Sequence, residues 1–282
     1  MSSPIKPVAG VVFGAAVLLL GFVAASAQTI VDGENNYSNV GAIMVWRVDD
    51  SGTPVQLLGI ASGTLIRPRV MVTAGHATAP TKALGGLPSS LRAFASFSAT
   101  NARDPGTWIP VVAEETHPSM PPCPPPPFCD PTDDMLVAPL EPGIADVGLV
   151  FLERAPASIK PAVLAVPGTL ERSEGARTTI VGYGTVSPPD KVTEVETWGW
   201  DGRRRIRAST VRRIVDETWG LWSIPSYVCF GDSGGGIFMN ARLVANVSDG
   251  GKDCRRHNNN NRLDTRAIQK WIAATIQAHR ER

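Results

Sequence analysis

The chain has 282 residues, of which 43% are hydrophobic and 19% charged, and its formal net charge is +1. This balance is ordinary for a globular protein that buries a large core, and the length permits one large β domain or two. A net charge so close to zero gives no reason to expect nucleic acid or an anionic membrane as a partner.

The amino terminus has the pattern of a secretion signal. Residues 8–25 are uncharged and largely apolar, follow Lys6 and end at an Ala25-Ser26-Ala27 cleavage site. The pattern predicts a signal peptide over residues 1–27, after which residues 28–29 could form a short pro-segment. An uncleaved anchor is the alternative, because eighteen apolar residues are barely enough to span a bilayer. We expect a secreted protein, extracellular or periplasmic, that does not associate with membranes once the signal is removed.

Short apolar or alternating runs, separated by Gly, Pro, Ser and Asn, follow along the chain and predict an all-β barrel or sandwich. The first set comprises Ala42–Val48, Gln56–Ile60, Val70–Thr73, Leu91–Phe97, Trp108–Ala113 and Val147–Leu152. The second comprises Thr178–Tyr183, Thr193–Trp198, Ile206–Ile214, Gly236–Met239 and Leu243–Val247. Residues 155–177 would connect the two sets.

One helix is predicted at the carboxyl end. Asp264 or Thr265 could cap it, and it would place apolar and neutral side chains on one face: Ile268, Trp271, Ile272, Thr275 and Ile276. Upstream, the basic run Arg203–Arg207 with Arg212 and Arg213 could bind a polyanion. The alternating small and apolar residues among these arginines favour exposed strand faces instead.

A glycine-rich segment carries the strongest chemical signal. Cys229-Phe230-Gly231-Asp232-Ser233-Gly234-Gly235 places Ser233 in a tight turn that can expose its hydroxyl beside backbone N–H groups. Upstream, His76 follows an apolar run and Asp146 opens another. A histidine, with an ordinary pKa near ~6.5, can take the serine proton near neutral pH, and a carboxylate can orient that histidine. His117, His257 and His279 lie in less suitable places, a proline-rich insertion, an Asn-rich loop and the terminal helix.

The order His76, Asp146, Ser233 resembles the trypsin/chymotrypsin family of serine endopeptidases. The resemblance covers most of the chain from Ile30 onward. It includes a mature amino terminus, a strand before the histidine and a strand opening a second barrel, at Ile30-Val31-Asp32-Gly33, Ser62-Gly63-Thr64-Leu65-Ile66 and Val181-Gly182-Tyr183-Gly184. It implies two antiparallel six-stranded β-barrels and a C-terminal α-helix within a protease domain over residues 30–282. The implied activity is hydrolysis of peptide bonds in protein or peptide substrates by a monomer without a cofactor.

The resemblance also assigns roles around the serine. The N–H groups of Gly231 and Ser233 would form the oxyanion hole, and Asp232 would pair with the new ammonium of Ile30 after cleavage. A chain that starts at Gln28 would then be weakly active. Tyr227 would form the floor of the primary substrate pocket, where trypsins have aspartate, so cleavage after Arg or Lys is not supported.

Ser248-Asp249-Gly250 corresponds to a family segment that normally reads Ser-Trp-Gly and pairs with the substrate backbone. Asp249 departs from it, and could attract basic substrates or face water.

Four cysteines behind a secretion signal indicate two disulfides, and the sequence alone permits three pairings. The resemblance implies Cys229–Cys254 beneath the specificity pocket and therefore leaves Cys123–Cys129. The latter lies in a proline-rich insertion at about 114–142, which predicts a stiff surface loop. The loop would lie near the substrate cleft and select substrates, or would have no function. Asp130, Asp133 and Asp134 could bind calcium there, but they match no calcium-loop motif, so no metal is expected.

Two other functions fit parts of the sequence. Gly231-Asp232-Ser233-Gly234-Gly235 satisfies the G-x-S-x-G pattern of serine esterases, but apolar strands rather than a helix follow it, and the partners would have to come after the serine. A trypsin-fold protein that binds partners without catalysis would usually lack one of the three candidate residues, and this chain has all of them.

Overall fold

The computed structural model describes residues 30–121, 143–191, 194–214, 219–222, 228–250, 253–255 and 258–281, with only the backbone considered over 219–222. The predicted signal peptide and pro-segment, the centre of the proline-rich insertion with Cys123 and Cys129, and Tyr227 lie outside these residues. Within the described part, no helix is long and apolar enough to cross a membrane.

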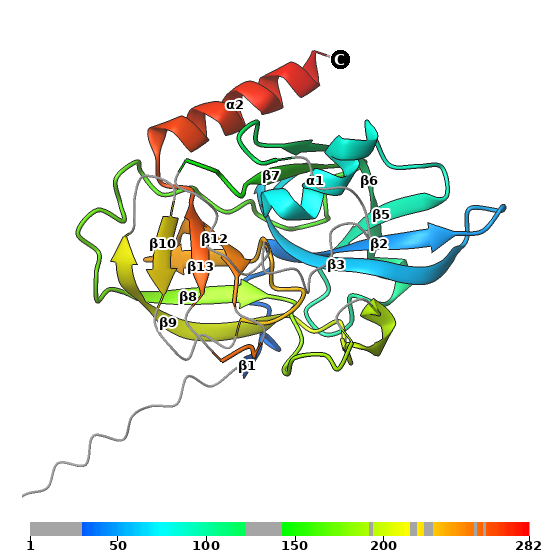
Figure 1. Ribbon diagram of the computed structural model, residues 1–282, viewed down its shortest axis with the longest axis horizontal. Helices are drawn as coiled ribbons and strands as arrows, with labels where there is room; N and C mark the ends of the chain where they lie inside the picture. Colours follow the sequence, from blue (N-terminus) through cyan, green and yellow to red (C-terminus); the bar gives the residue numbers. More distant parts are fainter. Residues whose placement is uncertain are drawn as a thin grey trace, which may run out of the picture.

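Most of the described elements are strands, and among the described residues the two α-helices follow β4 and β13 (Figure 1). The strands are β1 Ile30–Val31, β2 Val40–Val48, β3 Pro54–Arg67, β4 Val70–Thr73, β5 Leu91–Ser96, β6 Trp108–Thr116, β7 Gly148–Leu152, β8 Arg177–Gly182, β9 Arg205–Ile214, β10 Trp219–Trp222, β11 Gly236–Met239, β12 Arg242–Asp249 and β13 Asn259–Arg262. The α-helices are α1 Gly75–Leu84 and α2 Arg266–Arg280, and short 3-10 helices cover Pro105–Thr107 and Val195–Thr197.

The first barrel closes in the order β2-β3-β4-β7-β6-β5. Its strands bury an apolar cluster that includes Ile43, Leu65, Met71, Val150 and Leu152. Burial of such side chains is the main driving force for closing the sheet. The barrel is the right-hand body in Figure 1, with α1 lying beside it.

The second barrel is formed by β8, β9, β10, β13, β12 and β11, and a pairing between β8 and β9 closes it. The two-residue strand β1 adds to the outer edge of β9, where Ile30 pairs with Ile206. The prediction of two six-stranded antiparallel barrels is therefore confirmed. The connection between them, residues 153–176, contains no named strand or helix, as expected for the linker.

The terminal helix is also as predicted. The Thr265 hydroxyl accepts a hydrogen bond from the Ile268 N–H, which is the usual N-cap interaction. Ile268, Ile272 and Ile276, spaced four residues apart, are buried. Near the end of the helix, His279 stacks on Phe151 of the first barrel.

Three expectations about local structure were wrong. The segment predicted as a strand at Thr193–Trp198 contains a 3-10 helix, and α1, β10 and β13 were not predicted. The proline-rich insertion was expected to begin at Glu114, but β6 continues to Thr116 by pairing with β7. The arginines of this basic run were expected on exposed faces; Arg212 and Arg213 are exposed, whereas Arg205 and Arg207, like the preceding Arg204, are buried.

Candidate active site

His76 lies in the first turn of α1, directly after β4. The start of this helix passes very close to β7, because a Cβ on Gly75 would lie only 2.9 Å from the backbone nitrogen of Val147. This close approach requires glycine and brings His76 beside Asp146. The His76 backbone N–H donates to Asp146 Oδ1 at 2.7 Å, and His76 Nδ1 lies 2.8 Å from Asp146 Oδ2.

Asp146 is completely buried and held from both barrels. The Ser248 hydroxyl donates to its Oδ2. Two asparagines of the second barrel hold its backbone: Asn261 Oδ1 accepts from the Asp146 N–H at 2.9 Å, and Asn246 Nδ2 donates to the Asp146 carbonyl at 3.2 Å. The carboxylate is thus fixed in position before any substrate binds.

The electrostatics of this pair suit a base with an orienting carboxylate. Burial disfavours the His76 imidazolium, but the charge and hydrogen bond of Asp146, with a smaller contribution from Asp249, outweigh it and raise the pKa of His76 above its ordinary value. Burial likewise disfavours the Asp146 carboxylate, yet His76 and the Ser248 hydroxyl hold the pKa of Asp146 below its ordinary value. His76 retains a side-chain exposure of 22%, so its ring can be reached from solvent.

Ser233 lies in a turn that packs against the first barrel at the junction of β4 and α1. The Ser62 N–H donates to the Ser233 carbonyl at 2.8 Å. The neighbouring Gly234 leaves no room for a side chain, because its Cβ would lie 2.1 Å from Thr73 Oγ1 and 2.6 Å from the Ala74 nitrogen. The turn therefore lies next to the chain segment that leads into His76. No hydrogen bond joins His76 to Ser233 in the described part of the chain.

The backbone of this turn leaves two donors unused. Gly231 has a φ of +94°, in the region that favours glycine. Among the described residues, the N–H groups of Gly231 and Ser233 have no acceptor, whereas the N–H of Asp232 between them donates to the Cys229 carbonyl. Two such donors can stabilise a developing oxyanion.

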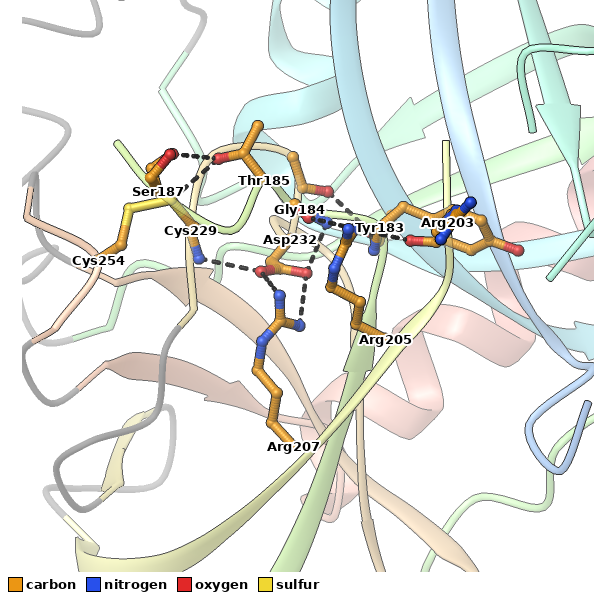
Figure 2. Close-up of polar contacts among 12 residues, drawn as sticks. Tyr183, Gly184, Thr185, Ser187, Arg203, Arg205, Arg207, Cys229, Asp232 and Cys254 are labelled. Carbon is orange, nitrogen blue, oxygen red and sulfur yellow. Dashed lines mark hydrogen bonds and ion pairs between the residues drawn. A yellow bond between two sulfur atoms is a disulfide. The ribbon is translucent and has the colours of Figure 1, made fainter. Parts of the chain in front are cut away.

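The Asp232 side chain is fully buried beside Arg207 of the second barrel (Figure 2). Its carboxylate accepts from the backbone N–H groups of Gly184 and Cys229 at 2.8 and 2.9 Å. Arg207 approaches both carboxylate oxygens, with Nη1–Oδ1 and Nη2–Oδ2 distances of 3.0 Å. A Cβ at Gly184 would lie 2.2 Å from Asp232 Oδ2, so glycine there makes room for the carboxylate.

The expected pair between Ile30 and Asp232 requires a freed amino group at Ile30, so it stays a prediction. Ile30 lies on the surface in β1 with 57% of its area exposed, and its nitrogen is part of a peptide bond to Thr29. The cation beside Asp232 is Arg207, which the sequence analysis did not single out as a partner. In the sequence, Arg207 stands out only as one basic residue in a run whose alternating pattern predicts a strand.

The residues predicted for the substrate pocket have different surroundings. Ser248 is buried and directs its hydroxyl to Asp146. Asp249 is partly exposed and accepts a hydrogen bond from Asn259 Nδ2 at 2.9 Å. Gly250 lies against the carbonyl of Val228, which a Cβ would approach to 2.6 Å. Tyr227 is outside the described residues.

The disulfide Cys229–Cys254 is present and connects the start of the serine turn to the segment after β12. The Thr185 hydroxyl contacts the sulfur of Cys229 at 3.0 Å, so the turn is also connected to the segment that follows β8 (Figure 2). The bridge therefore holds the beginning of the serine turn in place.

Comparisons with known proteins agree with this arrangement. The Trypsin family model matches residues 133–272. Among solved structures, the one titled "Structure of GrC" superposes with a TM-score of 0.57 at 17% identity, covering 86% of this chain and 96% of that one. Human heparin binding protein gives 0.59 at 13% identity, covering 89% and 96%, and HL collagenase 0.56 at 15%, covering 86% and 94%. No curated protein sequence matches the chain.

The fold is thus that of the trypsin-like proteins, and the Trypsin family model matches the second half of the chain. One neighbour is named for binding heparin and another for a collagenase activity, and at these identities the likeness concerns the fold alone. The choice between catalysis and binding therefore depends on the site itself.

Proposed function

We propose that the protein is a secreted serine endopeptidase that cleaves peptide bonds through Ser233, His76 and Asp146. The observation that carries the proposal is the buried Asp146 carboxylate, which accepts from the backbone N–H of His76 and lies 2.8 Å from its Nδ1. A carboxylate in this position selects the tautomer with the proton on Nδ1 and leaves Nε2 free to act as a base.

Each of the three residues acts in both halves of the proposed reaction, acylation and deacylation. His76 Nε2 takes the proton of Ser233 as the hydroxyl oxygen attacks the peptide carbonyl, and Asp146 stabilises the imidazolium that forms. The N–H groups of Gly231 and Ser233 bind the resulting oxyanion. Collapse of this intermediate breaks the C–N bond, and His76 gives its proton to the leaving amine. Water then attacks the acyl-enzyme by the same steps and releases the carboxylic acid.

The two oxyanion donors should stabilise the negative charge that develops on the carbonyl oxygen in the transition state. Removal of one such donor costs on the order of 10²–10³ in turnover in other enzymes. The two donors of this turn have no competing acceptor among the described residues, which supports their use in this role.

A direct test is to incubate the secreted protein with casein and with a serine-reactive phosphonate. We expect cleavage of casein and covalent labelling at Ser233, and Ser233→Ala should lose both while unfolding at the same temperature. Ser209→Ala is a matched control, since this hydroxyl lies in β9 away from the turn. Intact casein and no labelling with the wild type would instead indicate a binding protein of the same fold. Hydrolysis of small esters without any peptide cleavage would indicate an esterase.

A further inference from the structure

The charge of Asp232 is already neutralised inside the second barrel. Arg207 lies on β9 with only 1% of its area exposed, and Asp232 is the only group to which its guanidinium donates a hydrogen bond among the described residues. Two buried charges in this geometry stabilise each other, whereas either one alone would be strongly unfavourable. The carboxylate therefore needs no further cation.

The position of this pair links it to the serine turn. Asp232 lies between Gly231 and Ser233, which supply the two unused N–H groups, so a carboxylate held in place restrains the backbone of the turn that carries both donors. The carboxylate also accepts from Cys229 and Gly184, and Arg207 fixes it against both (Figure 2). An unpaired carboxylate would have to turn toward water and would rotate the turn with it.

The amino-terminal segment is held elsewhere. Asp32 is buried, and its carboxylate pairs with Arg204 Nε at 2.9 Å while accepting from the N–H groups of Asn36 and Tyr37. Ile30, two residues earlier, pairs with Ile206 on the outer edge of β9. The pairing of β1 thus holds Ile30 on β9, whereas the carboxylate of Asp232 is already paired with Arg207.

We infer that Arg207 is a positioning residue for the oxyanion turn, and that it makes the turn competent without proteolytic release of the amino group of Ile30. The inference rests on the proposed function, because the turn has a catalytic role only if the protein is a protease. In place of activation by cleavage before Ile30, the Arg207–Asp232 ion pair would order the turn when the second barrel folds. The enzyme would then be active as soon as it is folded, whatever the residue at its amino terminus.

The first experiment compares three forms of the wild-type chain: one starting at Gln28, one starting at Ile30, and one starting at Ile30 with an acetylated amino group. We expect their kcat/KM values on a peptide substrate to agree within about threefold, because none of them changes the cation beside Asp232. A larger gain on freeing Ile30, reversed by acetylation, would overturn the inference.

The second experiment removes the cation. Arg207→Met should lower kcat by about 10²–10³ with little change in KM, since the oxyanion donors act mainly in the transition state. Arg207→Lys should recover part of the loss because it restores the charge. Arg212→Met is the matched control, as Arg212 is exposed on the same strand, and it should leave kcat unchanged. An Arg207→Met enzyme that keeps full kcat below its unfolding temperature would show that the pair is only structural.

Hydrogen exchange separates this inference from the proposed function. Amides in the peptide covering residues 228–235 should be equally protected in the three amino-terminal forms and lose protection in Arg207→Met. This readout needs no catalysis, so it tests the role of Arg207 even if the wild type proves to be a binding protein. Unchanged protection in Arg207→Met would refute the inference while leaving the protease assignment intact.

Discussion

The two barrels have the same strand number but different interiors. The first is filled by apolar side chains such as Leu65 and Met71. The second also has an apolar cluster, yet it buries Arg207 on β9, and Arg204 directly before β9 is buried against the start of β2; each is paired with an aspartate. The first barrel is closed mainly by a non-directional force, whereas charged groups in the second must meet specific partners.

The two barrels also supply different groups to the candidate active site. His76 and Asp146 come from the first barrel, while the second supplies Ser233 and most of the groups that orient the others. Asn261 and Ser248 hold Asp146 from across the interface between the barrels, through contacts that span more than 100 residues of sequence. Directional polar contacts suit this purpose, because they fix the orientation of a group as well as its position.

The largest expected effect comes from the first barrel. Asp146→Asn should lower kcat by roughly 10⁴, because the amide can no longer select the Nδ1–H tautomer or stabilise the imidazolium. Wild-type activity should fall as the pH drops through the raised pKa of His76, and in Asp146→Asn this acid limb should move to lower pH. The limb moves because burial, which lowers the pKa of His76, is then less opposed. Asp49→Asn, on an exposed hairpin, is the control.

Full pH–rate profiles of the wild type and of Asp146→Asn check this prediction. Similar kcat values for Asp146→Asn and the wild type would contradict the assigned role of Asp146. An acid limb at the same pH in both would show that another group titrates there.

The contrast between the barrels also determines what could be predicted from the sequence. The first barrel follows hydrophobic alternation, and β4 was predicted to the residue. In the second barrel, β13 consists of Asn259, Asn260, Asn261 and Arg262, three of which are buried. A run of asparagines signals a loop when it is judged by local propensity, and only partners far away in the sequence make it a strand.

In the candidate site too, local sequence features identified some residues and not others. The chain order of His76, Asp146 and Ser233 was sufficient to select candidates, because their types and flanking runs are local features. Arg207 and Asn261 could not be selected in this way. Their roles depend on which side of a strand faces inward, and in β9 Arg205 and Arg207 face inward while Ala208 is exposed, the opposite of the usual pattern.

The second prediction compares the stabilities of the two interiors. Asp32→Asn leaves the Arg204 guanidinium buried without its carboxylate and should lower the free energy of unfolding by about 3–5 kcal/mol. Leu65→Ala in the first barrel should cost about 2–5 kcal/mol through lost burial and a cavity. The double variant Asp32→Asn/Arg204→Met should be more stable than Asp32→Asn alone, because it removes the unpaired charge.

Urea unfolding of the three variants measures these differences. Asp32→Asn combined with Leu65→Ala provides the control, since sites in different barrels should be additive within about 0.5 kcal/mol. If Asp32→Asn proved neutral, the buried pair would contribute nothing to the second barrel, and the distinction between the two interiors would fail.

The smallest expected effect concerns an exception in the first barrel. Glu114 on β6 is a partly buried carboxyl whose one side-chain partner among the described residues is the Thr81 hydroxyl of α1. Without a cation, burial raises the pKa of Glu114 to about 7, despite the opposing hydrogen bond from Thr81. A carboxyl whose pKa is raised on folding stabilises the fold fully below its unfolded pKa, and this contribution is lost as the pH rises through about 7.

Glu114→Gln should therefore stabilise the protein at pH 8, by on the order of 1–3 kcal/mol, and change little at pH 4. Thermal unfolding at the two pH values measures the effect. Glu153→Gln, an exposed site at the end of β7 with the same change in charge, should be nearly neutral at both. Equal effects of Glu114→Gln at pH 4 and pH 8 would mean that the carboxyl ionises normally, and the first barrel would then tolerate a charge without the arginine partners that the second barrel requires.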